Sequence, residues 1–333
     1  MSQQKDRPVN PDGEAKKQNP NSGPLTRAFL RWFRHVRRLE KRVALLEEEN
    51  ARMLEETREW RRFHPPGHFY SPVPSREEVE ETFRRDEFGL TFGGIELDEA
   101  AQAALLETFA GWMPDMPFPE HATPGWRYHL ENPSYPAFDG VILYSMLRHA
   151  QPRRVIEVGS GFSSAAMLDL NERVFGGRME LTFIDPDMRR LRALLRPGDE
   201  SRVRLIEKRV QDVPLAEFDR LESGDVLFID SSHVAKIGSD VNRLYFDVLP
   251  RLKPGVLIHI HDIAANLDYP RQWYDEGRAW NESYLLRAFL MYNRTFEVVL
   301  FTQWIATLRI HWLHRHMPLC ARGGGGQIWL RRV

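Results

Sequence analysis

A short run of glycine, serine and glutamate offers groups that could bind a small polar ligand. The sequence Glu157-Val-Gly-Ser-Gly161 ends an apolar stretch, and Ser163 and Ser164 follow it. Gly159 and Gly161 allow the backbone to turn sharply and to approach a ligand without a side-chain clash, and the serines can cap a following helix. A dinucleotide fingerprint would have glycine where Ser164 stands, and no Walker lysine follows, so a dinucleotide and a triphosphate are both disfavoured.

Acidic and amide side chains close the neighbouring apolar stretches. Glu157 at the first turn suits a ligand with a cationic end. Asp185 stands where a carboxylate can accept hydrogen bonds from both hydroxyls of a ribose. Gln211 and Asp212 follow the third apolar stretch and are placed to meet an adenine edge. Together these groups predict a nucleoside with a positively charged amino-acid tail, which is S-adenosylmethionine.

The elements that must position these groups alternate between strand and helix. Apolar strand patterns occur at 154–158, 180–185, 203–207, 225–230, 256–260, 296–301 and 327–331, and helical patterns at 137–149, 163–174, 188–195, 239–249 and 281–292. Strands separated by helices indicate an α/β protein with a doubly wound parallel sheet. A ligand of such a sheet lies beyond the carboxyl ends of its strands.

The end of the chain departs from this alternation. No helix of comparable pattern separates the strand at 296–301 from the strand at 327–331, which predicts an antiparallel, hairpin-like finish. The run Gly323-Gly-Gly-Gly326 is too long for a tight turn, and it predicts a mobile connector between the two strands.

The N-terminal part divides into a tail and a long helix. Residues 1–24 hold little to bury and are predicted to form a disordered tail, and residues 25–64 are predicted to form a coiled-coil helix. Its seam alternates spacings of three and four residues through Phe29, Trp32, Val36, Leu39, Val43, Leu46, Asn50, Met53, Thr57 and Trp60. Because Asn50 favours a parallel pair in one register, we expect a homodimer. The alternative is one amphipathic helix lying on its own globular domain.

The first half of this helix is strongly basic. It carries Arg27, Arg31, Arg34, Arg37, Arg38, Lys41 and Arg42 against Glu40. We interpret these residues as a solvated charged face, and the alternative is contact with an acidic membrane surface or with phosphates.

Residues 65–135 follow the Pro65-Pro66-Gly67 break and are rich in aromatic side chains. Helical patterns occur at 75–85 and 98–111. This region is predicted to be a helical and aromatic cap that contributes to the substrate site, and the alternative is a packing layer, since aromatic residues are more often core than ligand. Residues 136–333 then form the cofactor-binding domain.

The composition excludes several classes of protein. A formal net charge of -1 over 333 residues disfavours a stable nucleic-acid partner. The single cysteine, Cys320, excludes an internal disulfide and a Cys-rich zinc site. The polar start lacks a signal-peptide core, and the longest apolar stretches, such as 141–147, are too short to span a bilayer. We therefore expect a cytoplasmic protein with no transmembrane segment.

The motifs together resemble those of a known family. The sequence is similar to the class I S-adenosylmethionine-dependent methyltransferases of the family 24 type, related to catechol O-methyltransferase, over about residues 135–333. The strongest segments of this resemblance are Glu157-Val-Gly-Ser-Gly161, Phe183-Ile-Asp185, Gln211-Asp212, Phe228-Ile-Asp-Ser-Ser-His233 and His259-Ile-His-Asp262. The tail, with Trp280-Asn-Glu-Ser-Tyr-Leu-Leu, Phe296-Glu-Val-Val and Gly326-Gln-Ile-Trp-Leu330, also resembles bacterial members of the group. The resemblance implies a Rossmann-like seven-stranded sheet of order 3-2-1-4-5-7-6 with strand seven antiparallel. The expected cofactor-binding residues are Glu157, Gly159, Ser160, Gly161, Ser163, Ser164, Asp185, Gln211, Asp212 and Asp230.

The resemblance also implies the residues of the reaction. In the catechol-type relatives, the residue matching Asp230 binds a divalent metal and a lysine matching His233 is the general base. Here His233 is expected to take that role, with a pKa near neutral. Asp230, His261 and Asp262 would hold a divalent ion, Mg²⁺ or Mn²⁺, and the alternative for His261 is a hydrogen bond to a loop. Ser231 stands where the family usually has glycine.

The chemical class of the acceptor follows from a missing motif. No Asn/Asp-Pro-Pro-Tyr/Phe sequence follows Asp230, which disfavours amide and exocyclic nitrogen acceptors. The leading hypothesis is methylation of a hydroxyl on a small molecule or sugar-like metabolite. The alternatives are a glycan, lipid-linked or other macromolecular acceptor, or a non-catalytic cofactor-binding module on a coiled-coil assembly protein.

Overall fold

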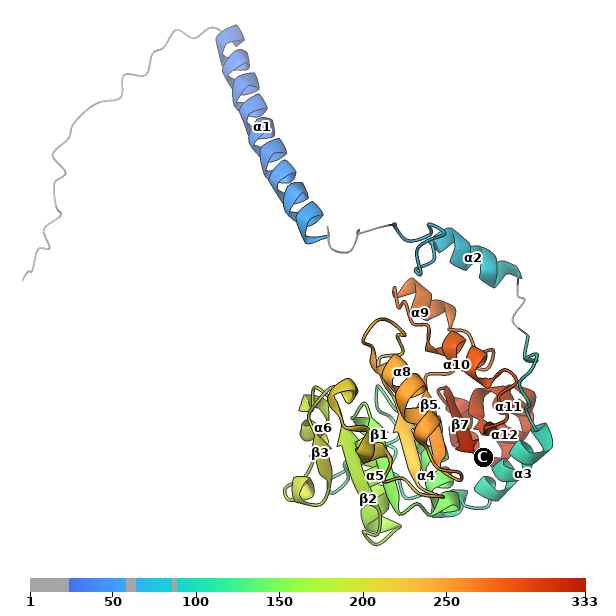
Figure 1. Cartoon of the computed structure of the whole chain (residues 1–333). Coiled ribbons are helices and arrows are strands. Elements are labelled where there is room, and N and C mark those ends of the chain that lie inside the picture. Colours follow the sequence, from blue (N-terminus) through green and yellow to red (C-terminus); the bar gives the residue numbers. More distant parts are fainter. Residues whose placement is uncertain (1–23, 58–63, 86–88) are drawn as a thin grey trace, which may run out of the picture. The chain divides into compact units, whose positions relative to one another are not determined.

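The computed structural model describes residues 24–57, 64–85 and 89–333 (Figure 1). The chain divides into two compact units, residues 1–71 and residues 72–333. Among the described residues, no helix is both long and apolar enough to cross a membrane.

The first unit contains the predicted long helix, α1 (Pro24–Glu56). Apolar side chains of the predicted seam are exposed: Trp32 has 59% of its surface accessible, Val43 52% and Leu46 57%. Tertiary packing stabilises most protein helices, and these side chains do not have it. The predicted seam residue Trp60 lies outside the described residues.

The second unit is built on a seven-stranded sheet of order β3-β2-β1-β4-β5-β7-β6. Its strands are β1 (Arg154–Val158), β2 (Glu180–Ile184), β3 (Arg204–Ile206), β4 (Val226–Ile229), β5 (Leu257–His261), β6 (Phe296–Phe301) and β7 (Gln327–Arg332). The first five strands are parallel, and β7 pairs antiparallel with both β5 and β6. The Rossmann-like fold class, the strand order and the antiparallel seventh strand are confirmed.

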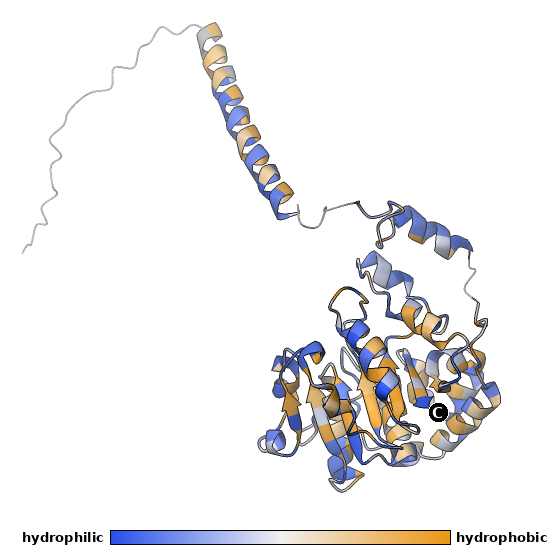
Figure 2. Cartoon of the chain, viewed as in Figure 1, coloured by the Kyte–Doolittle hydropathy of each residue, from blue (hydrophilic) through white to orange (hydrophobic). Residues whose placement is uncertain are grey.

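Helices flank this sheet and bury its strands. They are α4 (Ala137–Ala150), α5 (Phe162–Arg173), α6 (Arg189–Leu194), α7 (Leu215–Phe218), α8 (Asp240–Arg243), α9 (Arg271–Asp275) and α10 (Glu282–Leu290), with short turns η2 (Asp199–Ser201), η3 (Val210–Asp212), η4 (Leu244–Val248) and η5 (Leu249–Arg251). Helix α5 packs on α4 and α6, whereas η4 packs on α7 and α8. Strands β4 and β5 are buried throughout, as expected for parallel strands covered on both faces. The residues of β4 are all apolar (Figure 2), whereas β5 also contains His259 and His261.

The expectation that no helix separates the last two strands was wrong. Helices α11 (Thr302–Leu308) and α12 (Ile310–His316) and the turn η6 (Pro318–Arg322) lie between β6 and β7. Each helix has only seven residues, too short for a helical period to stand out in the sequence. The glycine run is also tied down, because Asp139 Oδ1 accepts hydrogen bonds from the Gly325 backbone (3.0 Å) and from the Gln327 side chain (3.0 Å).

The region before the sheet packs against it. Helix α3 (Glu99–Ala110) contacts β6 and α11, and α2 (Arg76–Arg85) contacts α9; the turn η1 (Met113–Asp115) follows α3. Leu106, Phe109, Phe118 and Tyr128 join the hydrophobic core. Most of the described part of this region therefore forms a packing layer, and among its described residues only 133–135 line the cavity presented below.

Candidate active site

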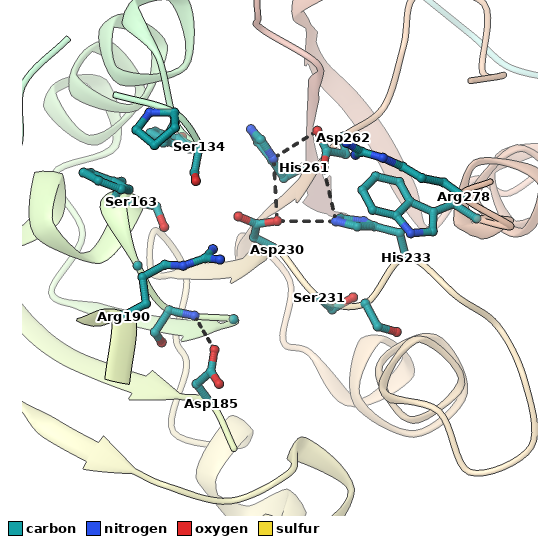
Figure 3. A pocket seen from close by; sticks show the side chains of 18 of the residues that line it. Ser134, Ser163, Asp185, Arg190, Asp230, Ser231, His233, His261, Asp262 and Arg278 are labelled. Atoms are coloured by element: carbon teal, nitrogen blue, oxygen red, sulfur yellow. Dashed lines mark hydrogen bonds and ion pairs between the residues drawn. The ribbon is translucent and has the colours of Figure 1, made fainter. Parts of the chain in front are cut away.

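The carboxyl ends of β1, β2, β4 and β5 open into one cavity of about 690 Å³ (Figure 3). Its lining residues are Pro133, Ser134, Tyr135, Gly159, Ser160, Gly161, Phe162, Ser163, Asp185, Arg190, Asp230, Ser231, Ser232, His233, His261, Asp262, Trp273, Arg278 and Trp280. Parallel strands end at the same sheet edge, so motifs far apart in the sequence meet here. The predicted residues Gly159, Ser160, Gly161, Ser163, Asp185, Asp230, His233, His261 and Asp262 are all on its wall.

The glycine turn after β1 is fixed by its neighbours. Gly159 has a φ of +85°, and a Cβ there would collide with the backbone carbonyl oxygen of Asp230. The backbone N–H of Ser160 donates a hydrogen bond to Asp185 Oδ2 at 2.8 Å. Only glycine fits position 159 without strain or collision. The contacts with Asp185 and Asp230 join the turn to the ends of β2 and β4.

Glu157 does not lie on the cavity wall, where the sequence placed it beside a cationic ligand. Its side chain is fully buried and accepts hydrogen bonds from the hydroxyls of Ser163 (2.5 Å) and Ser164. The Ser164 hydroxyl in turn accepts the backbone N–H of Gly161 at 3.0 Å. Burial raises the pKa of Glu157 to about 8, although both serines lower it. In this structure Glu157 and Ser164 hold the start of α5 from beneath the glycine turn.

Gln211 and Asp212 also lie away from the cavity lining. The Gln211 amide donates a hydrogen bond to the carbonyl oxygen of Gly238 at 2.7 Å. Asp212 accepts two hydrogen bonds from Arg209, and this pair lowers the pKa of Asp212. The predicted contact with an adenine edge therefore stays a prediction for these two residues.

Two carboxylates and two imidazoles form the opposite side of the cavity. His233 Nε2 lies 3.5 Å from Asp230 Oδ1 and 3.4 Å from Asp262 Oδ2. His261 Nδ1 lies 3.6 Å from the same Asp230 atom and 3.5 Å from Asp262 Oδ1. Figure 3 shows the four side chains, from the ends of β4 and β5, pointing toward one another. His233 and Asp262 have φ values of +58° and +57°, a left-handed backbone that non-glycine residues rarely adopt and that often marks functional sites.

Each imidazole turns its other nitrogen to a carboxylate outside the cavity wall. His233 Nδ1 lies 2.9 Å from Glu282 Oε2, and His261 Nε2 lies 3.4 Å from Asp139 Oδ1. Both carboxylates are buried. Sequence reasoning missed Glu282 and Asp139, because neither belongs to a strand-end motif. Each is an acidic residue within the first turn of a predicted helix, and Glu282 also lies in a tail segment that resembles the family.

The cluster shifts the pKa values of its members. Burial would lower the pKa of His233, but hydrogen bonds to Asp230 and Glu282 outweigh it and raise the pKa to about 10. The near-neutral pKa expected from the sequence was therefore wrong. Burial also opposes the charged form of His261, yet the charges of Asp230 and Asp262 raise its pKa well above the usual value. Both imidazoles hold the pKa of Asp230 well below its usual range against the effect of burial, whereas burial raises the pKa of Asp262.

The same cluster offers ligands for a divalent ion. Asp230, His233 and Asp262 each present one ligand atom, and these atoms lie within 4.8 Å of one another. His261, the imidazole expected as a ligand, also faces both carboxylates. Carboxylate oxygen and imidazole nitrogen suit Mn²⁺ and similar ions, and carboxylates alone suit Mg²⁺. The donor set therefore fits a metal of the expected kind.

An aromatic and cationic wall borders the cluster. The Trp280 ring lies 4.5 Å from the His233 ring and 4.9 Å from the Trp273 ring, between centroids. The Arg278 guanidinium lies over both indoles, at 4.7 Å and 4.8 Å from their centroids. Arg190 extends into the cavity from the side of Asp185 (Figure 3). Sequence reasoning assigned no role to these four residues.

Comparison with known proteins gives the family. Residues 156–263 match a family model described as a methyltransferase domain, of the type 24 that the sequence resembles. An uncharacterized protein of Archaeoglobus fulgidus is 32% identical over 173 residues, which cover 50% of this chain and 76% of that protein. The chain belongs to this methyltransferase family. Its sheet order and its glycine turn after β1 agree with the class I fold that the sequence resembles, and it is a methyltransferase.

Solved structures with a similar fold are more distant. An S-adenosylhomocysteine-bound methyltransferase from Podospora anserina is 16% identical, with 79% of this chain and 99% of that chain covered and a TM-score of 0.39. The O-methyltransferase TomG from Streptomyces achromogenes, in complex with S-adenosylmethionine, is 16% identical, with 77% and 96% covered and a TM-score of 0.39. CmcI with Mg and S-adenosylmethionine is 21% identical, with 58% and 69% covered and a TM-score of 0.34. These likenesses are too distant to transfer an activity.

Proposed function

We propose that this methyltransferase transfers the methyl group of S-adenosylmethionine to a hydroxyl of a small molecule or sugar-like metabolite. The observation that carries the proposal is the single cavity that joins the glycine turn and Asp185 to the cluster of Asp230, His233, His261 and Asp262. A cavity of this kind can hold the donor and the acceptor side by side.

The cofactor would lie over the glycine turn. Gly159 and Gly161 line the cavity with their backbone, and the Asp185 carboxylate lines the same cavity as an acceptor for ribose hydroxyls. The negative charge of Asp230 would favour the positive charge of the sulfonium group. Ser160 and Ser163 would line the part of the cavity between these carboxylates.

His233 would act as the general base. The hydroxyl oxygen of the acceptor attacks the methyl carbon, the carbon–sulfur bond breaks with its electron pair going to sulfur, and the hydroxyl proton passes to His233 Nε2. The raised pKa of His233 means that it holds a proton, which balances the negative charge of its carboxylate neighbours while no cofactor is bound. A cationic cofactor beside Asp230 offsets that charge and lowers the pKa of His233, which prepares the base only when the donor is bound.

Asp230, His261 and Asp262 would hold a divalent ion, Mg²⁺ or Mn²⁺. A bound ion of this kind lowers the pKa of a coordinated hydroxyl. Asp230 and Asp262 would supply the negative charge that balances a bound cation.

The acceptor would occupy the side formed by Tyr135, Trp273 and Trp280. Indole and phenol rings offer flat apolar surfaces to a ring-shaped acceptor, while the hydroxyl faces His233.

The exposed seam of α1 supports homodimer formation. Val43 and Leu46 lie on the seam and Leu45 lies off it, although all three are exposed. We expect Val43→Glu or Leu46→Glu to give monomers in analytical ultracentrifugation and Leu45→Glu to stay dimeric. Equal behaviour of all three variants would exclude the seam as the dimer contact.

The cofactor site can be tested by removing the Asp185 carboxylate. We expect Asp185→Ala to weaken binding of S-adenosylmethionine by on the order of 1.5–3 kcal/mol, because charge-assisted hydrogen bonds to the ribose are lost. Isothermal titration calorimetry measures this. The matched control is Asp187→Ala, since Asp187 is exposed and paired with Arg189 outside the cavity lining. Unchanged affinity in Asp185→Ala, or an equal loss in the control, would contradict the assignment.

A further inference from the structure

We propose that Glu282 is a positioning residue for methyl transfer: it holds Nδ1 of His233 so that Nε2 faces the acceptor hydroxyl. The inference rests on the proposed function of His233 as the general base. It adds a residue that no strand-end motif contains, 49 positions further along the chain.

The first observation is the contact itself. Glu282 Oε2 and His233 Nδ1 are 2.9 Å apart, and the two residues are 0% and 4% exposed. Glu282 Oε1 has no hydrogen-bond partner among the described residues. Burying a carboxylate is costly unless its charge is compensated. His233 is the group placed to compensate it, so the pair explains why an acidic side chain is buried here.

The second observation is that the whole segment around Glu282 holds the His233 loop. The backbone N–H groups of Asn281 and Glu282 both donate to the carbonyl oxygen of His233, at 3.0 and 3.2 Å. The Asn281 side chain accepts from the backbone N–H of Ala235 (2.6 Å) and donates to its carbonyl oxygen (3.2 Å). The Trp280 ring packs on the imidazole. Three consecutive residues thus fix the backbone, the ring plane and one ring nitrogen of His233.

The third observation is the direction that remains for the other nitrogen. With Nδ1 held by Glu282, Nε2 points to Asp230 and Asp262 on the cavity wall. An imidazole that donates its Nδ1–H must present the lone pair of its Nε2 when it acts as a base. If the imidazole were rotated by half a turn, Nδ1 would no longer face Glu282 and Nε2 would no longer face the acceptor hydroxyl.

The pair of variants Glu282→Ala and Glu282→Gln tests this role in the full-length protein. The amide oxygen of glutamine can still accept the Nδ1–H, whereas alanine removes the acceptor. We expect Glu282→Ala to lower kcat about tenfold to a hundredfold with an unchanged KM for S-adenosylmethionine, because misplacement of a catalytic group by about 1 Å can cost that much. Glu282→Gln should recover most of kcat.

A double-mutant cycle separates positioning from a merely structural role. If Glu282 acts through His233, Glu282→Ala should change kcat less than about twofold in the His233→Ala background. An equal loss of kcat in both backgrounds, or a Glu282→Gln enzyme as slow as Glu282→Ala, would overturn the proposal.

A second measurement does not depend on turnover. The imidazole Nδ1–H of His233 should give a downfield proton resonance in NMR spectra, identified by its loss in His233→Gln. This resonance should be retained in Glu282→Gln and lost in Glu282→Ala. A resonance that persists in a folded Glu282→Ala protein would overturn the proposal. If the wild-type protein methylates no hydroxyl acceptor, the proposed function fails, and the resonance alone decides whether Glu282 orients His233.

Discussion

The two sides of the cavity are built in different ways. On the cofactor side, most of the proposed contacts follow one another in the chain from Gly159 to Ser163, where backbone geometry positions them, and Asp185 is added from the end of β2. On the acceptor side, His233 and His261 depend on carboxylates from distant segments, Glu282 and Asp139. The cofactor side can therefore be recognised from a local motif, whereas the acceptor side exists only after the chain has folded.

This difference agrees with the two tasks. A common cofactor presents the same atoms to every enzyme of the class, so one short turn can bind it in all of them. Acceptors differ, and binding residues concentrate in loops that a rigid scaffold positions. Trp273, Arg278 and Trp280 belong to such a segment, between β5 and α10.

The largest expected effect tests whether close backbone packing shapes the cofactor side of the cavity. We expect Gly159→Ala to lower the free energy of unfolding by about 3 kcal/mol or more, because its Cβ would collide with the carbonyl oxygen of Asp230. Urea denaturation measures the change. The control is Gly176→Ala, where φ is also positive (+63°) but no atom lies within 4 Å of the added Cβ. Equal losses in both variants would show that backbone strain, and not the approach of β4, makes glycine necessary.

The second prediction tests whether turnover and cofactor binding depend on different sides of the cavity. We expect His233→Ala to cut kcat about a hundredfold or more, as loss of a general base does, without weakening the binding of S-adenosylmethionine. Steady-state kinetics and calorimetry measure the two quantities. A tenfold weaker Kd together with normal turnover would reverse the roles assigned here.

The smallest expected effect concerns Glu157 beneath the cofactor side. Its pKa is raised from 4.5 to about 8 on folding. Between these values the unfolded chain releases a proton that the folded chain keeps, so the contribution of Glu157 to stability falls as the pH rises from about 5 to 8. In Glu157→Gln this fall is absent. We therefore expect the unfolding free energy of the wild type, measured relative to that of Glu157→Gln, to fall by on the order of 1–3 kcal/mol across that pH range.

Urea denaturation at several pH values measures this effect. Glu180→Gln is the control, because Glu180 is an exposed carboxylate on the neighbouring strand β2. Stability curves of wild type and Glu157→Gln that stay parallel from pH 5 to 8 would mean that Glu157 is already ionised in the folded protein.

Much of the fold could be predicted from the sequence because its signals are local. The apolar strands at 154–158 and 296–301 begin and end in the structure where their patterns do. Helices α11 and α12 were missed because two seven-residue helices carry too little periodicity. Gln211 and Asp212 lie on a short 3-10 turn after a strand and form hydrogen bonds with Gly238 and Arg209, so their contact with an adenine edge stays a prediction.

The sequence by itself determined the strand-end motifs, because sheet topology brings the carboxyl ends of parallel strands to one edge whatever the loops do. It thereby determined that Gly159, Asp185, Asp230 and Asp262 share a cavity. Only the tertiary structure decided which carboxylates are buried against the two imidazoles and how strongly their pKa values move. Those quantities depend on distance and on exclusion of water, and neither is written in the local pattern of residues.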